Sequence, residues 1–239
     1  MNILVTGGAS GLGEAITRNL AQTESNKIYF TFCKSADKAK ELENQFSNAK
    51  GIFCDFENEI SLQTLLSQIE FLDIHALINN AFTGLETNYF HKINPEYFSE
   101  NFIKNVVPVI KITQQAILHF RKQKSGKIVT ILSSYIINKP PMGLSEYVAA
   151  KNYLLSLSKS WAVENAKFNI TSNAISPAFM QTQLTSDTDE RIVEEMVKNH
   201  PLKKILSPSE VADSVQYLLN ASSQINGINL IMNAAADIV

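Results

Sequence analysis

The sequence predicts an α/β fold: a doubly wound parallel sheet of seven strands with helices on both faces. Apolar runs of strand length alternate with longer segments of helical period along the whole chain. The runs are nearly continuous in apolar residues, as in parallel strands that helices cover on both sides. No repeat, low-complexity tract or Pro/Ser-rich linker divides the chain, so we predict a single domain over residues 1–239.

The predicted strands and helices follow from two different periodicities. The strands are short apolar runs, and they cover residues 3–6, 28–32, 51–54, 76–78, 128–132, 170–175 and 228–232. The helices have apolar residues at three- and four-residue intervals, and they cover residues 12–21, 36–45, 60–69, 97–122, 146–168 and 208–219. Residues 179–205 break the alternation with a polar insertion and an amphipathic stretch at 190–198. We interpret this insertion as a lid over a site, with a solvated surface excursion as the alternative.

Composition and charge restrict the possible partners. Hydrophobic residues make up 45% of the 239 residues and charged residues 18%, a balance that allows a large core. The net charge of -2 gives no overall field that would attract nucleic acid or an anionic membrane, so we expect neither partner. The apolar runs are shorter than the roughly 20 residues that cross a bilayer, and no export signal is visible. A cytoplasmic protein is expected.

Cysteines and histidines give no sign of a disulfide or a metal site. Cys33 and Cys54 each close an apolar run, which favours buried free thiols. The four histidines are scattered without ligand spacing, so no metal is predicted.

A glycine-rich turn follows the first predicted strand, with the sequence Thr6-Gly7-Gly8-Ala9-Ser10-Gly11-Leu12-Gly13. Glycines here allow a tight turn and the close approach of a pyrophosphate to backbone N–H groups, while the next helix presents its positive N-terminal end. The strand, turn and helix together predict a dinucleotide phosphate site. Its predicted binding residues are Gly7, Ser10, Gly11, Leu12 and Gly13.

Tyr147 and Lys151 lie four residues apart on a predicted helix, so their side chains emerge on one face and can share a site. Carbonyl reduction needs a proton donor for the oxygen, and a phenol with a pKa of about 10 is a poor donor at neutral pH unless it is perturbed. The ammonium of Lys151, with an oxidised nicotinamide, would lower the pKa of Tyr147 toward the working range. An ordinary exposed helical pair is the alternative.

Four motifs occur in one order along nearly the whole chain: the T-G-x-x-x-G-x-G turn, Asn79-Asn80-Ala81, the Tyr-x-x-x-Lys pair, and the N-x-x-x-P segment at 173–177. In these motifs the chain resembles the short-chain dehydrogenase/reductase family. The resemblance implies a Rossmann-type fold and an enzyme that interconverts a ketone and a secondary alcohol by hydride transfer.

The resemblance also implies the remaining catalytic residues. Ser134 lies thirteen residues before Tyr147, the family spacing, and its hydroxyl is expected to bind the carbonyl oxygen. Ser133 is one residue off that spacing and is expected to point to the opposite face. Asn105, inside the predicted 97–122 helix, matches the asparagine that holds a water linking Lys151 to solvent.

NADP(H) is the implied cofactor, because no carboxylate ends the second strand and Lys34 can pair with a 2'-phosphate. Further cofactor-binding residues are implied by the family motifs: Asp55, Phe56, Asn79, Asn80, Ala81, Tyr147, Lys151, Pro177, Ala178 and Thr182. Phe82 and Ala178 stand where the family has glycine, and Phe82 puts the local loop conformation in question.

The general layout is most similar to 3-oxoacyl-[acyl-carrier-protein] reductases, which implies an acyl-carrier-bound ketone in polyketide or fatty-acid metabolism. Four basic residues near helix ends match that family's docking site for an acidic carrier protein, although the helix dipole also favours them there; they are Arg121, Lys122, Lys124 and Lys167. The alternatives are an NAD(P)-dependent dehydrogenase of a free small alcohol or steroid, and a non-catalytic nucleotide-binding partner subunit. The family implies a homodimer or homotetramer built through the two long helices.

Overall fold

Seven parallel strands form one sheet in the order β3-β2-β1-β4-β5-β6-β7, which confirms the predicted fold class. The computed structural model describes residues 1–236 and 238, so Val239 at the predicted domain end lies outside the described residues. The strands are β1 (Asn2–Val5), β2 (Lys27–Phe32), β3 (Ala49–Phe53), β4 (Ala76–Asn79), β5 (Gly126–Ile131), β6 (Ile170–Pro177) and β7 (Asn229–Met232).

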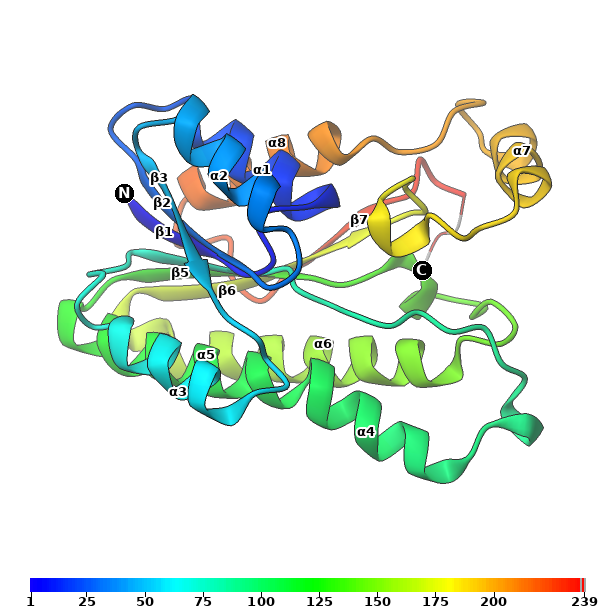
Figure 1. Ribbon diagram of the computed structural model, residues 1–239, viewed down its shortest axis with the longest axis horizontal. Coiled ribbons are helices and arrows are strands. Elements are labelled where there is room, and N and C mark those ends of the chain that lie inside the picture. The colour runs from blue at the N-terminus through cyan, green and yellow to red at the C-terminus, as the bar shows by residue number, and fades with distance from the viewer. Residues whose placement is uncertain (237, 239) are drawn as a thin grey trace.

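Helices cover both faces of the sheet (Figure 1). The helices are α1 (Gly11–Ala21), α2 (Ala36–Gln45), α3 (Glu59–Gln68), α4 (Pro95–Asn105), α5 (Val107–Gln123), α6 (Ser145–Asn165), α7 (Glu190–Asn199) and α8 (Pro208–Asn220). Helices α1, α2 and α8 lie on one face, and α3, α4, α5 and α6 lie on the other. Among the described residues, no helix is both long and apolar enough to span a membrane.

Two apolar clusters fix these layers to the sheet. On one face, Ile16 and Leu20 of α1 pack with Val215 of α8 over the strands. On the other face, Ile112 and Phe120 of α5 are fully buried against the sheet. Burial of each such side chain contributes about 1.5–3 kcal/mol, so the alternation of apolar strands and amphipathic helices accounts for the architecture.

The predicted helix over 97–122 is in fact two helices, and that prediction was wrong. Helix α4 ends at Asn105 and α5 begins at Val107. Pro108 has no N–H, and its ring clashes with the carbonyl of the residue four positions earlier, which interrupts the helix at this point. Asn105 therefore lies at a junction rather than inside a helix.

The order of the strands creates a switch point next to β1. Its neighbours are β2 and β4, so the connections that leave β1 and β4 run in different directions and open a crevice at the carboxyl ends of the strands. Asn80 links the two connections: its Nδ2 donates to the carbonyl oxygens of Thr6 (3.0 Å) and Gly7 (3.3 Å). The Thr6 hydroxyl accepts the N–H groups of Asn80 (3.0 Å) and Ala81 (3.1 Å). The glycine turn is thus held against the end of β4.

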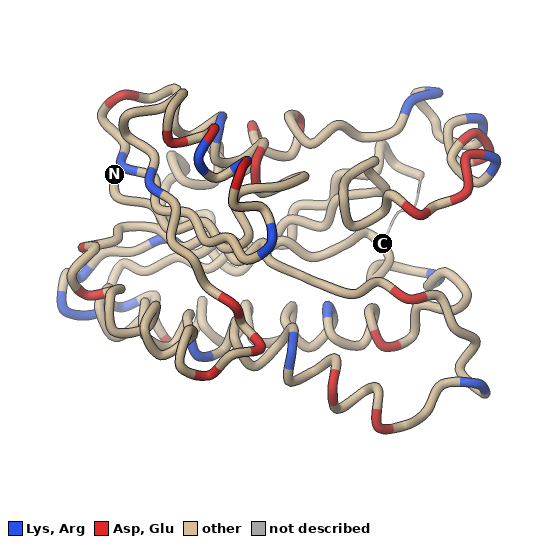
Figure 2. Tube along the Cα trace, in the orientation of Figure 1, with Lys and Arg blue, Asp and Glu red and all other residues tan. Residues whose placement is uncertain are grey.

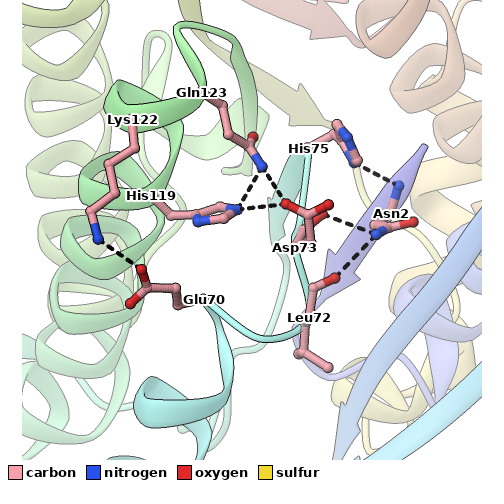
Figure 3. Close-up of polar contacts among 8 residues, drawn as sticks. All are labelled: Asn2, Glu70, Leu72, Asp73, His75, His119, Lys122 and Gln123. Atoms are coloured by element: carbon pink, nitrogen blue, oxygen red, sulfur yellow. Dashed lines mark hydrogen bonds and ion pairs between the residues drawn. The ribbon is translucent and has the colours of Figure 1, made fainter.

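A polar network holds the opposite, amino-terminal edge of the sheet (Figure 3). Nδ2 of Asn2 donates to the carbonyl oxygens of Leu72 (3.1 Å) and Asp73 (3.0 Å). The Asp73 carboxylate accepts from Nε2 of Gln123 (2.6 Å) and lies 3.4 Å from Nε2 of His119. These contacts join the turn before β4 to β1 and to the last turn of α5.

Candidate active site

A pocket of about 660 Å³ lies along the carboxyl ends of the strands, within the size range of small-molecule sites. Most of the predicted site residues line it. They are Gly7, Ser10, Gly11, Leu12, Gly13, Lys34, Asp55, Phe56, Asn80, Ala81, Asn105, Tyr147, Lys151, Pro177, Ala178 and Thr182. Asn79 and Ser134 do not line it. The pocket therefore joins the glycine turn to the Tyr147–Lys151 pair.

The glycine turn forms a cradle that side chains would fill. Gly7 and Gly11 have positive φ angles of 64° and 53°, a conformation that L-residues rarely adopt. A Cβ on Gly13 would lie 2.0 Å from the carbonyl oxygen of Gly7. Ser10, the N-cap of α1, makes no capping hydrogen bond with its side chain. An open backbone at a helix N-terminus suits a pyrophosphate, so these residues fit a dinucleotide.

The loops after β2 and β3 line the far end of the pocket. Lys34 is exposed there, and none of the ion pairs among the described residues involves it. The Asp55 carboxylate accepts the N–H of Glu57 (3.0 Å), which shapes the loop. Cys54 is buried as predicted, and burial raises its pKa to about 11, whereas Cys33 is exposed and the prediction for it was wrong. Cys33 comes after the last strand residue, Phe32, where the chain has already left the sheet.

Asn79 supports the sheet and does not line the pocket, so a role for it in cofactor binding stays a prediction. Successive strand residues point to opposite faces, and Asn79 turns toward the helix layer while Asn80 turns toward the glycine turn. Nδ2 of Asn79 donates to the hydroxyl of Thr113 on α5 at 2.9 Å. Its side chain thereby joins β4 to α5.

Tyr147 and Lys151 project from the first turns of α6, and both are buried in the pocket wall. Nζ of Lys151 donates to the carbonyl oxygen of Ile131 at 2.9 Å and lies 5.8 Å from the centre of the Tyr147 ring. The spacing of four residues on one helix thus brings the two side chains together, as predicted.

Burial dominates the protonation of this pair. It raises the pKa of Tyr147 to about 12, although a hydrogen bond with the Ser133 side chain acts in the opposite direction. It also lowers the pKa of Lys151 to about 7. Burial outweighs that hydrogen bond, and a lowering of the Tyr147 pKa by Lys151 together with an oxidised nicotinamide stays a prediction. At neutral pH Tyr147 keeps its proton.

Ser133, not Ser134, lies beside Tyr147, so the geometry favours Ser133, and a catalytic role for Ser134 stays a prediction. Ser133 is buried and lines the pocket, whereas Ser134 is only half-buried and does not. The chain stays extended through Ser133 (φ -160°, ψ 146°) and turns into a 3-10 helix at Ser134. The family spacing between serine and Tyr147 runs through an irregular segment, where the number of residues does not determine which side chain points inward.

Asn105 acts on the backbone of a neighbouring loop. Its Oδ1 accepts the N–H of Thr83 (2.8 Å), and its Nδ2 donates to the carbonyl oxygen of the same residue (3.0 Å). The side chain is buried and lines the pocket at the α4–α5 junction. These two bonds fix the segment after β4, and a role in holding a water stays a prediction.

Several pocket residues besides Ser133 were not among the predicted site residues, and three of them bear on the surroundings of Tyr147 and Lys151. The ring of Phe82 meets the Tyr147 ring edge to face, with centroids 5.0 Å apart at 83°. Tyr135 follows the serine pair, and burial raises its pKa. Lys104 of α4 pairs with Glu57 across the pocket at 2.7 Å. The sequence signals only Phe82, by its position directly after Asn79-Asn80-Ala81 where the family has glycine.

The four basic residues near helix ends lie away from this pocket. Helices α5 and α6 lead into the amino ends of β5 and β6, so residues at their C-termini sit at the opposite edge of the sheet from the site. Nζ of Lys122 pairs with Glu70 at 2.7 Å, and Nε of Arg121 donates to Asn165 at 2.7 Å. Figure 2 shows acidic and basic residues intermixed along the Cα trace. Docking of an acidic carrier protein at these residues stays a prediction.

The predicted insertion at 179–205 begins at the pocket and then leaves it. A 3-10 helix (Gln183–Thr185) lines the pocket together with Thr182. Helix α7 follows close to the predicted 190–198 stretch and has no buried residue. Its packing is therefore light, while a role as a lid stays a prediction.

Known proteins share this sequence and this architecture. The family model for short chain dehydrogenases matches residues 1–192. An acetoacetyl-CoA reductase from Synechocystis is 30% identical over 98% of this chain and 95% of its own length. A 3-oxoacyl-[acyl-carrier-protein] reductase from Escherichia coli is 28% identical over 96% of this chain and 94% of its own length.

Solved structures agree on the fold. A crystal structure of a variant of actinorhodin polyketide ketoreductase with NADPH superposes with a TM-score of 0.88 over 99% of this chain and 97% of that chain, at 21% identity. At this identity the likeness concerns the architecture alone. Together with the match over residues 1–192, the pocket geometry leads to one conclusion: the chain belongs to the short-chain dehydrogenase/reductase family, whose members are oxidoreductases acting on CH–OH and keto groups.

Proposed function

We propose that this protein reduces the ketone of a 3-oxoacyl thioester to a secondary alcohol with NADPH. The observation that carries the proposal is the meeting of Ser133, Tyr147 and Lys151 in a pocket that begins at the glycine turn. The acyl thioester is supported by relatives named acetoacetyl-CoA reductase and 3-oxoacyl-[acyl-carrier-protein] reductase, which match nearly the whole chain.

The residues that would hold the cofactor lie in sequence along the pocket. The backbone N–H groups of the glycine turn at Gly7, Gly11 and Gly13 would bind the pyrophosphate, because no side chain covers them. The Ser10 side chain makes no hydrogen bond that caps helix α1, so its hydroxyl could bind the pyrophosphate too. NADPH, when bound, supplies the hydride. The exposed ammonium of Lys34 suits the extra 2'-phosphate, since lysine binds phosphate as a point charge.

The proton moves through Tyr147 in this proposal. Its phenol is protonated at neutral pH, so it donates its proton to the carbonyl oxygen as the carbon is reduced. The Ser133 hydroxyl donates a second hydrogen bond to the same oxygen, where negative charge develops. The ammonium of Lys151 stabilises the phenolate left on Tyr147, and both groups are shielded from water.

Three further parts of the proposal concern the surroundings of the site. Residues 179–205 act as a lid, because their first residues line the pocket and α7 is lightly packed.

The chain acts as a homodimer or homotetramer in the cytoplasm. Apolar side chains exposed on the outer faces of α5 and α6 suit contacts between copies of the chain; they are Leu118, Tyr153 and Val163.

Replacement of Tyr147 by Phe tests the chemistry. We expect Tyr147→Phe to lower kcat with acetoacetyl-CoA by about 10²- to 10⁴-fold, because the proton donor is lost while the ring and its packing remain. The Kd for NADPH, measured from its fluorescence on binding, is expected to stay unchanged. Full activity in this variant would overturn the assignment.

The substrate and cofactor classes need separate comparisons on the unmodified protein. Turnover is measured with acetoacetyl-CoA, an acyl-carrier-bound 3-oxoacyl chain, a free small ketone and a steroid ketone, each with NADPH and NADH. The proposal requires higher kcat/KM for the thioesters and for NADPH. A preference for free ketones, or tight NADPH binding without turnover of any ketone, would contradict it.

A further inference from the structure

We propose that Phe82 is a positioning residue that holds the Lys151 ammonium on its ring face and the Tyr147 ring against its edge. The proposal rests on the roles given above to Tyr147 and Lys151. Nζ of Lys151 lies 4.6 Å from the centre of the Phe82 ring, and the rings of Phe82 and Tyr147 pack nearly perpendicular with centroids 5.0 Å apart. One side chain therefore contacts both members of the pair.

The Phe82 ring gives the Lys151 ammonium a second favourable electrostatic contact besides its one hydrogen bond. The ammonium has three donors, and its one hydrogen-bond acceptor given by the described residues is the carbonyl oxygen of Ile131. No ion pair among those residues includes Lys151. The negative face of an aromatic ring attracts a cation, and the attraction is strongest where water is excluded. Phe82 thus stabilises the charged form of a buried lysine.

None of the other titratable groups discussed for this pocket supplies a negative charge beside the Lys151 ammonium. Tyr147 on the same helix and Tyr135 from the segment after β5 are both protonated phenols at neutral pH, because burial raises the pKa of each. Lys104 on α4 is itself basic and already paired with Glu57. Asp55 and Glu57 line the nucleotide end of the pocket, and burial alone accounts for the lowered pKa of Lys151.

The position of the ring is itself fixed. Asn105 clamps both backbone groups of Thr83, the residue that follows Phe82. The ring also packs against the apolar cluster that includes Val106 and Leu132. A side chain held by its neighbour's backbone and by buried contacts can set the geometry of the two groups it touches. This arrangement gives Phe82 a function that a glycine at the same position could not perform.

Fluorination of the Phe82 ring tests the proposal, because it weakens and then reverses the negative ring face while the shape changes little. Phe82 is replaced by phenylalanines with one, three and five ring fluorines. The pKa of Lys151 is measured by NMR of carbon-labelled lysine in the free protein, so the readout does not depend on activity. We expect a stepwise fall of about one unit across the series. The basic limb of the pH profile of kcat/KM for ketone reduction moves down by the same amount.

Three variants serve as controls. Phe82→Tyr keeps the ring face and is expected to keep the pKa of Lys151, whereas Phe82→Leu loses the face and is expected to match the ring with three fluorines, whose face is nearly neutral. The same fluorination at Phe102, which packs edge to face on Tyr153 at 5.0 Å, is expected to leave Lys151 unchanged. An unchanged pKa of Lys151 across the Phe82 series in folded protein would overturn the proposal. Undiminished turnover in Tyr147→Phe would instead refute the proposed function, and the Lys151 titration would still report on Phe82.

Discussion

The hydroxyl of Ser133 and the phenol of Tyr147 meet in a pocket wall from which bulk water is largely excluded. Burial keeps the proton on Tyr147 and lowers the pKa of Lys151 to about 7. The lysine therefore loses its charge as the pH rises through neutrality, while the tyrosine remains an acid. At the scale of single residues, reduction is expected to be favoured at or below neutral pH.

The two neighbouring serines give a direct test at this scale. Ser133→Ala is expected to lower kcat by about 10²- to 10³-fold, because it removes a donor aimed at the developing oxyanion. Ser134→Ala is the matched control and is expected to change kcat by no more than about twofold, since its side chain lies outside the pocket. Steady-state kinetics with one ketone substrate measure both. The reverse order of effects would restore Ser134 as the catalytic serine.

Two short breaks between helices and strands determine where the pocket residues lie. The glycine turn between β1 and α1 places open backbone at the pocket, and the junction between α4 and α5 places Asn105 beside the loop after β4. At both points regular structure is interrupted. The first break exposes backbone groups of the glycine turn to the pocket, and the second places Asn105 where it can bind the backbone of Thr83.

Replacement of Gly13 by Ala tests the packing of the first turn. The added Cβ would lie 2.0 Å from the carbonyl oxygen of Gly7, so the turn must shift. We expect a loss of about 1–3 kcal/mol in the free energy of unfolding and a large loss of NADPH affinity. Gly227→Ala is the control: its φ of 78° gives strain, but its Cβ meets only Ala162 at 3.6 Å, away from the pocket. That variant is expected to lose stability and keep cofactor binding. If Gly13→Ala bound NADPH as tightly as the unmodified protein does, the assignment of the glycine turn as the pyrophosphate site would be contradicted.

The alternation of apolar runs and amphipathic segments was enough to predict the strands, their number and the two helix layers. It could not reveal the break at Val106, because the apolar period continues through Pro108. It also could not assign Ser133, which depends on the path of an irregular segment, or the contact of Phe82 with Lys151, which depends on a loop folding back. Periodicity reports regular structure, and these features lie between regular elements.

Across the whole molecule, the pocket and the polar network around Asn2 and Asp73 lie at opposite edges of one sheet. The pocket follows the carboxyl ends of the strands, whereas the network around Asn2 and Asp73 joins the amino ends to α5. The core between them is apolar on both faces. Changes at the amino edge should therefore affect stability without affecting catalysis.

Asn2→Ala tests this separation. It removes two hydrogen bonds to the turn before β4 and is expected to lower the free energy of unfolding by about 1–2 kcal/mol. Denaturant unfolding measures this loss, and kcat/KM for ketone reduction below the unfolding transition is expected to stay unchanged. A fall in kcat/KM in fully folded protein would show that the two edges are coupled.

The bond from Lys151 to the carbonyl oxygen of Ile131 uses an acceptor that every amino acid carries. No substitution at position 131 can delete that oxygen, so the anchor of the ammonium is immune to point mutation as long as the strand persists. Side chains around it can therefore change without removing the oxygen that holds the charge.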